Sequence, residues 1–182
     1  MASNDLTMTG ARELDEALKT LSSKIQKNIM KSALRAGANV FRNEIKANAP
    51  VGPANSENAR LYGGYAGALR DSVRTSVSVD KSGRISASVK VGGKTKKGAD
   101  VFYAHFLEFG TTAHVIKAKE NGSLHIGNSF PKSVNHPGIR PHPFVRPAFD
   151  GKAPQAIAAV AQQIRNRLTK EGINVPAPDA IE

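Results

Sequence analysis

The feature that most constrains the fold is an aromatic run at residues 101–111, Val-Phe-Tyr-Ala-His-Phe-Leu-Glu-Phe-Gly-Thr. It holds four of the ten Phe and Tyr residues of a chain that has no Trp and no Cys. Large aromatic side chains bury more apolar area than other residues, so the run is predicted to mark the packing centre. Phe102, Phe106 and Phe109 are spaced as on one side of a short helix that ends at Gly110, although so short a run also fits a strand.

A pair of amphipathic helices is predicted before the aromatic run. Apolar residues recur every three or four positions from Leu14 onward, which is typical of a helix that buries one face. A break is expected near Ser22, because Ser23 and Gln26 have the spacing of a capping box. The second helix is expected to end before Pro50, since the residue preceding a proline disfavours helical geometry.

The second of these helices separates its basic side chains from its apolar ones. At about 100° per residue the two sets project from opposite halves of the helix. The basic row is a solvated face in one interpretation and, in the other, a surface that meets phosphates or an acidic neighbouring subunit. Its members are Lys24, Lys27, Lys31, Arg35, Arg42 and Lys46, and the opposite apolar residues are Ile25, Ile29, Ala33, Ala36 and Val40.

A β-hairpin and a last helix are predicted with clear patterns. Apolar and polar residues alternate over 73–79 and again over 85–91, on either side of an Asp-Lys-Ser-Gly turn. This period of two indicates a hairpin with one buried face. The last helix is expected to be capped by Asp150 and to end near Gly172.

These segments together predict an α+β fold. It consists of an N-terminal helix pair, an antiparallel hairpin or small sheet, a short aromatic helix and a C-terminal helix packed on the sheet. Most of the chain is expected to form one structural domain with three long loops and a flexible segment at each end. The flexible ends are 1–9 and 173–182, the domain is 10–172, and the loops are 50–68, 92–100 and 112–142.

Two of these loops carry further patterns. The loop 92–100 is basic and glycine-rich, and Lys94, Lys96 and Lys97 are its candidate polyanion contacts. It does not match a phosphate-binding P-loop, because Ser88 stands where that motif requires its first glycine. In the loop 112–142, two short strands are expected at His114–Lys119 and Ser123–Gly127. Five prolines within 130–147 are expected to exclude regular structure across most of that span.

Composition narrows the classes of function. The chain has 26 Lys and Arg against 15 Asp and Glu, a net charge of +11, which favours association with polyanions or with an acidic protein. No stretch approaches the ~20 apolar residues of a membrane span, no secretory signal is visible, and no membrane contact is expected. The five histidines show no metal-ligand spacing and there is no cysteine, so neither a metal nor a cofactor is expected.

Glu108 is the one candidate for catalysis. A carboxyl among aromatic residues resembles a general acid with a raised pKa. However, no second acid or nucleophile with a recognisable spacing accompanies it. The alternative is a structural carboxylate that accepts hydrogen bonds from loop amides or pairs with Arg140 or Arg146. An enzyme is therefore not expected.

Two motifs, in this order after a helix pair and a hairpin, resemble a known family. The chain is similar over about residues 8–170 to the tail-completion, or head–tail joining, proteins of long-tailed bacteriophages, the Hong Kong 97 gene-product-ten-like family. It departs from that pattern by a longer connection before Gly67 and by a large insertion at 112–142. The signature residues are Tyr103, Ala104, Phe106, Glu108, Phe109, Gly110 and Thr111, followed by Pro143, Phe144, Arg146 and Pro147.

The resemblance implies a structural virion protein without a catalytic site, made in the host cytoplasm and located in the neck of the virion. Such a subunit forms a homo-oligomeric ring that completes the tail and joins it to the head connector. Its expected partners are further copies of itself, the head connector or adaptor, the tail terminator or tail tube, and DNA that passes through the channel. A basic nucleic-acid-binding module and a small hydrolase using His and Glu108 are the alternatives.

Overall fold

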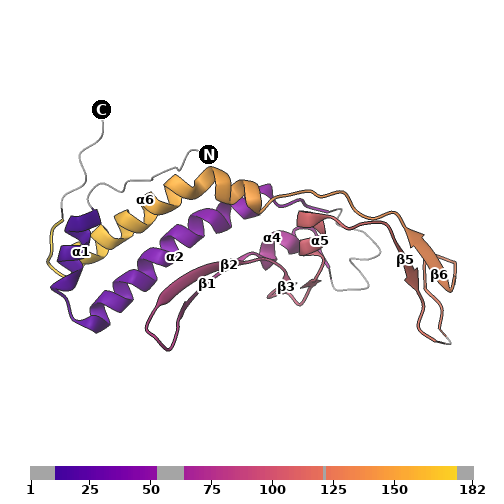
Figure 1. The fold of residues 1–182 in the computed structure, drawn as a ribbon, viewed down its shortest axis with the longest axis horizontal. Coiled ribbons are helices and arrows are strands. Elements are labelled where there is room, and N and C mark those ends of the chain that lie inside the picture. The colour runs from indigo at the N-terminus through magenta and orange to yellow at the C-terminus, as the bar shows by residue number, and fades with distance from the viewer. Residues whose placement is uncertain (1–10, 53–63, 121, 176–182) are drawn as a thin grey trace.

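The longest elements are two helices that lie side by side, α2 (Ser23–Asn48) and α6 (Arg146–Lys170), in a computed structural model that describes residues 11–52, 64–120 and 122–175 (Figure 1). Small residues let these helices approach closely. A Cβ atom at Gly37 of α2 would stand 2.6 Å from Val160 Cγ2 and 3.1 Å from the carbonyl oxygen of Ala156. Any larger residue at Gly37 would therefore push α6 away from α2.

The predicted helix pair is confirmed as α1 (Ala11–Lys19) and α2, with the break near Ser22 and the end before Pro50. The predicted capping box is wrong. Ser22 occupies the N-cap position without a side-chain cap bond, and the Gln26 amide donates to the carbonyl oxygen of Leu21 at 2.8 Å. Gln26 thus satisfies a carbonyl of the connection between the two helices and not an N–H group of α2.

The predicted hairpin is confirmed as β1 (Arg74–Val79) and β2 (Ile85–Lys90), an antiparallel pair. Thr75 lies opposite Val89, and Val77 lies opposite Ala87, so the less polar side chains share one face. This face packs on α2, and the Thr75 hydroxyl donates to the Asn39 side chain at 3.2 Å. As a result α2 lies between α6 and the hairpin (Figure 1).

The core has two parts, one at each end of the helix pair. One joins α1, α2 and α6 through Leu14, Ile29 and Leu168, and Ile173 and Val175 pack against it, so the predicted flexible tail begins inside the body. The second surrounds Phe144, which is only 1% exposed. It gathers residues of α2, α4 (Ala68–Ser72), β4 (Asp100–Val101), α5 (Ala104–Phe109) and α6.

The prediction that the aromatic run is the packing centre is wrong for Phe102 and Phe109. The short helix exists as α5, but Phe102 is 56% exposed and Phe109 is 76% exposed. The buried members of the run are Val101, Ala104 and Glu108. A helix of six residues can bury only one narrow stripe, and here the stripe holds the small and the charged side chains.

Two other predictions on local structure need correction. The loop 92–100 contains a small hairpin, β3 (Gly93–Lys94) with β4, in which Thr95 is buried and its Oγ1 accepts from the Ala99 N–H at 3.1 Å. The last helix begins at Arg146, so Asp150 lies within it and does not cap it. The start of α6 is capped by a side chain from another element and not by Asp150.

Residues 112–142 form an arm that extends away from the helical body (Figure 1). Its ladder pairs β5 (His114–Lys117) with β6 (Ser133–His136), and Ile126 and Ser129 form a separate bridge. The first predicted strand is therefore confirmed, whereas the second, at Ser123–Gly127, is wrong. The strand β6 fits between Pro131 and Pro137 because none of its own four residues is a proline.

The predicted α+β class is confirmed, with N-terminal helices, small antiparallel sheets and a C-terminal helix that packs on them together with α2. Parts of the prediction fall outside the described residues, namely the segment 1–9, positions 53–63 of the loop 50–68 and the end of the C-terminal tail.

Candidate functional site

The carboxylate of Glu108 lies at the start of α6 and caps that helix. Its Oε2 accepts hydrogen bonds from the backbone N–H groups of Phe144 at 2.8 Å and Val145 at 2.9 Å, and its Oε1 accepts from Arg146 N–H at 3.0 Å. The first N–H groups of a helix have no partner within the helix, and the helix dipole favours negative charge there. Glu108, 38 residues before Arg146, accepts from three consecutive N–H groups at the start of α6, those of the first helical residue and of the two residues before it.

The surroundings of Glu108 set its protonation. Burial by itself raises the pKa of this carboxyl, but the hydrogen bonds from Phe144, Val145 and Arg146 lower it by more, so the pKa of Glu108 lies below its usual range. A carboxylate that is ionised at neutral pH does not donate a proton as a general acid. The hypothesis of a raised pKa is therefore wrong, and the hypothesis of a carboxylate bonded to loop amides is confirmed.

The alternative pairing of Glu108 with an arginine side chain is not formed. Within the described ranges no ion pair joins Glu108 to Arg140 or to the guanidinium of Arg146. The Arg146 side chain lies instead 3.7 Å from Asp150, one turn further along α6. Arg146 thus contributes its backbone N–H to the cap and its side chain to the surface.

The arm joins the body directly after Glu108. Gly110 has a φ of +72°, and a Cβ atom there would stand 2.6 Å from the carbonyl oxygen of Ile139. Thr111 and Ile139 exchange backbone hydrogen bonds of 3.0 and 3.1 Å, and the His142 N–H donates to the carbonyl oxygen of Leu107 at 2.7 Å. These hydrogen bonds join the two segments of the arm at its base, where one segment leaves α5 and the other returns to α6.

The structure brings the two signature segments together at this junction. The Tyr103 side chain is half-buried, and burial raises the pKa of its hydroxyl. The ring of Phe106 lies 3.9 Å from that of His105. The buried signature residues are Ala104, Glu108 and Phe144; the half-buried ones are Tyr103, Phe106, Gly110 and Thr111; and the exposed ones are Phe109, Pro143, Arg146 and Pro147.

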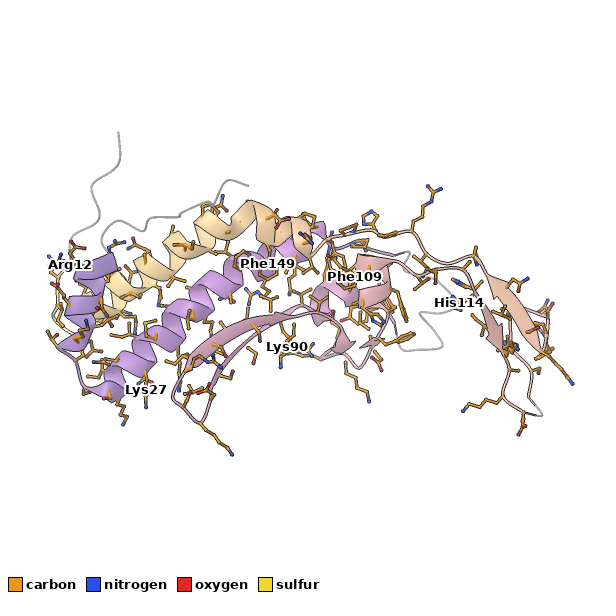
Figure 2. The ribbon with its side chains drawn as sticks, in the orientation of Figure 1. Arg12, Lys27, Lys90, Phe109, His114 and Phe149 are labelled. Carbon is orange, nitrogen blue, oxygen red and sulfur yellow. The ribbon has the colours of Figure 1, made fainter. Side chains whose placement is uncertain are left out.

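The predicted basic row on α2 is exposed only over its first part. Lys24, Lys27, Lys31 and Arg35 are exposed, and Lys27 extends away from the body in Figure 2. Arg42 and Lys46, further along α2, are half-buried, and Arg42 donates to the Asn43 side chain at 2.9 Å.

The three lysines of the segment 92–100 are exposed, but they do not share one environment. The Lys97 ammonium lies 3.4 Å from Asp71 Oδ2 and 4.6 Å from the centre of the Tyr65 ring. The Tyr65 hydroxyl donates to the same carboxylate oxygen at 2.7 Å, and this bond with the nearby Lys97 lowers the pKa of Asp71. Lys97 is therefore held by its own chain, whereas Lys94 and Lys96 point into solvent.

The arm has no buried side chain among its described residues, 112–120 and 122–142. Several of its large apolar side chains are exposed, among them Val115 at 54%, Ile126 at 47% and Phe130 at 63%. An isolated two-stranded hairpin is at best marginally stable in water. The stability of the arm thus depends on what covers it.

The body carries an apolar groove of about 580 Å³. Residues of α2 form its floor, and β2 and α6 form its two sides. Phe149 of α6 is 40% exposed at this groove, and its ring stacks on Phe41 of α2 with the ring centres 4.3 Å apart. The sequence pattern did not reveal this groove, because its residues come from three elements that each looked ordinary alone.

The histidines do not assemble a metal centre among the residues that the structure places. His114 and His136 lie opposite each other in the arm with ring centres 5.0 Å apart, and His125 lies beside Phe130. No third His, Asp or Glu side chain joins them within the described ranges. In the same part of the chain, no helix is long and apolar enough to cross a bilayer.

A model of the HK97-gp10-like family, described as bacteriophage HK97-gp10 tail components, matches residues 12–110. This is more than half of the 182-residue chain and runs from α1 to the end of α5. No curated protein and no solved structure matches the chain. This match places the chain in the HK97-gp10-like family of bacteriophage tail components, and its role is that of a structural tail component.

Proposed function

We propose that this tail component forms a ring in the neck of the virion, where it completes the tail and joins it to the head connector. The observation that carries the proposal is the arm, whose described residues bury no side chain and expose Val115, Ile126 and Phe130. Exposed apolar surface of this kind marks a site of protein–protein contact. These exposed side chains therefore support a subunit whose arm is covered by neighbouring subunits.

A ring accounts for contacts of this type. A contact between two different surfaces of the same chain is heterologous, and repeated around an axis it closes into a ring. The arm and the body present different surfaces, so the same chain can donate one and receive with the other. The remaining faces of the ring would then bind the head connector or adaptor on one side and the tail terminator or tail tube on the other.

The ring is tested by native mass spectrometry and negative-stain electron microscopy of the purified chain over a wide range of concentration. The proposal predicts one closed oligomer of fixed copy number with a central hole. A chain that remains monomeric at the highest concentration, both alone and mixed with tail-tube protein, would contradict it.

No catalytic step is part of this proposal. Both oxygens of Glu108 accept hydrogen bonds from backbone amides, which leaves this acid a structural task and no proton to donate. The hydrolase alternative required Glu108 as a general acid, and these hydrogen bonds remove Glu108 from that role.

Nucleic-acid binding is a second candidate, favoured by one observation. The exposed part of the basic row, from Lys24 to Arg35, forms a positive strip that no acidic side chain of the described residues neutralises. In a ring this strip would face DNA in the channel or an acidic neighbour. Binding through phosphates releases counterions and therefore weakens steeply as salt rises.

This candidate is tested by measuring DNA affinity against salt for the wild type and for a variant with Lys24, Lys27 and Lys31 changed to Gln. Each lost phosphate contact should reduce the slope of log K against log salt by ~0.9. A variant with Lys81 and Arg84 changed to Gln is the control, because these exposed residues lie in the hairpin turn. Equal slopes for all three proteins, or no binding at low salt, would exclude the basic row as a DNA contact.

A further inference from the structure

The arm and the apolar groove are unpartnered surfaces at different places on one chain. The groove lies over the middle of α2, between residues 34 and 41. The arm follows the C-terminal end of α5 and extends away from the body (Figure 1). The exposed side chains of Ile126 and Phe130 therefore stay outside the groove of their own chain. Figure 2 shows the same separation between Phe149 at the groove and His114 in the arm.

The groove has the features of a site for an extended segment. One side is β2, which contributes Ala87, Ser88 and Val89, while β1 contributes no lining residue. Among the residues that the structure describes, no third strand joins the sheet of β1 and β2, so the free edge of β2 borders the groove. A strand laid beside β2 would gain backbone hydrogen bonds from that edge and apolar contacts from α2 and α6.

We propose that the arm of one copy lies in the groove of a second copy of the same chain, against the free edge of β2. This inference rests on the proposed ring and names the contact that builds it. It joins an exposed apolar extended segment to an apolar groove that has a free strand edge, and each chain carries both surfaces once.

The chain itself supplies a matching occupant for the groove. The lining residues of the groove carry no charge, and the arm exposes the apolar side chains of Val115, Ile126 and Phe130. In addition, the contact is heterologous, because arm and groove are different surfaces, and such contacts form a ring when the rotation from copy to copy closes and an open filament when it does not.

Cross-linking tests the contact in the full chain, which contains no cysteine. The variant with Ser129→Cys in the arm and Ala153→Cys in the groove is treated with a short bismaleimide, and the products are separated by size. The proposal predicts a ladder of covalent oligomers up to the ring. The matched control pairs Ser129→Cys with Arg84→Cys in the hairpin turn, and it should give no ladder.

A mixing experiment tests the direction of the contact. Phe130→Asp should impair the arm and Ala153→Glu the groove, and each change should weaken self-assembly at least ~10-fold in dissociation constant. An equimolar mixture should form heterodimers and nothing larger, because only one intact arm and one intact groove remain in each pair. Hydrogen exchange of β2 should slow in these heterodimers relative to the separate variants.

The outcomes separate this inference from the proposed ring. Rings of wild-type protein without a ladder from the Ser129 and Ala153 pair would overturn the contact and leave the ring in place. Variants that still form full rings by themselves would do the same. A wild-type chain that does not assemble under any condition would overturn both.

Discussion

The Oε2 atom of Glu108 accepts a hydrogen bond of 2.8 Å from the backbone N–H of Phe144, at the point where the arm returns to the body. Through this contact α5 caps α6, and the Phe144 side chain is held in a core where it is only 1% exposed. The family match ends at residue 110, so the carboxylate lies inside the matched segment and its three donors lie beyond it. The contact therefore couples the family's segment to the last helix.

Replacing Glu108 tests the cap. Glu108→Gln keeps the shape of the side chain but replaces one carboxylate oxygen by an NH₂ group, which donates and does not accept. At least one of the three N–H donors therefore loses its partner. Charge-assisted hydrogen bonds of this kind contribute ~1.5–3 kcal/mol, and we expect a loss of ~2–3 kcal/mol in the free energy of unfolding by urea. Glu120→Gln, an exposed change in the arm, is the control and should leave the free energy of unfolding unchanged.

The pH dependence of stability should carry the signature of the same carboxylate. The pKa of Glu108 is lower in the folded chain than in the unfolded chain, so the folded state binds fewer protons. Its stabilising contribution is complete above the unfolded pKa of ~4.3 and is lost as pH falls through the lower folded pKa. The difference between wild type and Glu108→Gln should be constant near neutral pH and narrow below ~pH 4. Urea unfolding of both proteins from neutral pH to below ~pH 4 measures this difference. A difference that is the same at every pH would show that the carboxylate charge is irrelevant.

Phenylalanine substitutions separate the core from the surface. Phe144→Ala should cost ~3–5 kcal/mol, as expected for a large side chain removed from a tight core. Phe109→Ala should change stability by less than ~0.5 kcal/mol, because Phe109 is 76% exposed. The half-buried Phe106 should fall between the two. Thermal melts rank the three, and a larger loss at Phe109 than at Phe144 would contradict the described core.

The arm junction depends on the absence of a side chain at Gly110. Gly110→Ala would strain the φ of +72° and also force a Cβ atom against Ile139 and Pro141. Gly83→Ala in the hairpin turn, with a φ of +85° and no neighbour within 4 Å, carries the φ penalty alone. We expect ~1–2 kcal/mol for Gly83→Ala and at least ~1 kcal/mol more for Gly110→Ala. Equal losses in urea would show that the junction has room to adjust.

The sequence predicted the elements whose patterns are local. The repeat of apolar residues in α1 and α2, the alternation in β1 and β2 and the proline after α2 each act within a few residues of the feature they predict. The structural role of Glu108 was also predictable, because no partner for chemistry stood near it in the sequence. These inferences needed no knowledge of which segments meet.

The failures concern contacts between distant segments. Asp150 looked like a cap because the true cap, Glu108, lies 38 residues before Arg146 and pairs with it only in the folded chain. Phe109 looked like core because aromatic content does not show which side of a six-residue helix faces inward. The partner of β5 was misplaced because Ser123–Gly127 is closer in sequence than β6. The groove had no sequence signal, since α2, β2 and α6 each contribute a small part.

The central claim, that the arm builds a ring of this tail component, is tested most directly by native mass spectrometry of the wild type beside an arm-shortened chain. In the shortened chain a two-residue turn replaces residues 113–137 and keeps the bridge between Thr111 and Ile139. Because the described arm residues bury no side chain, the body should keep its unfolding free energy within ~1 kcal/mol. The account predicts one closed oligomer for the wild type and a folded monomer for the shortened chain. The same closed oligomer from both chains would contradict it.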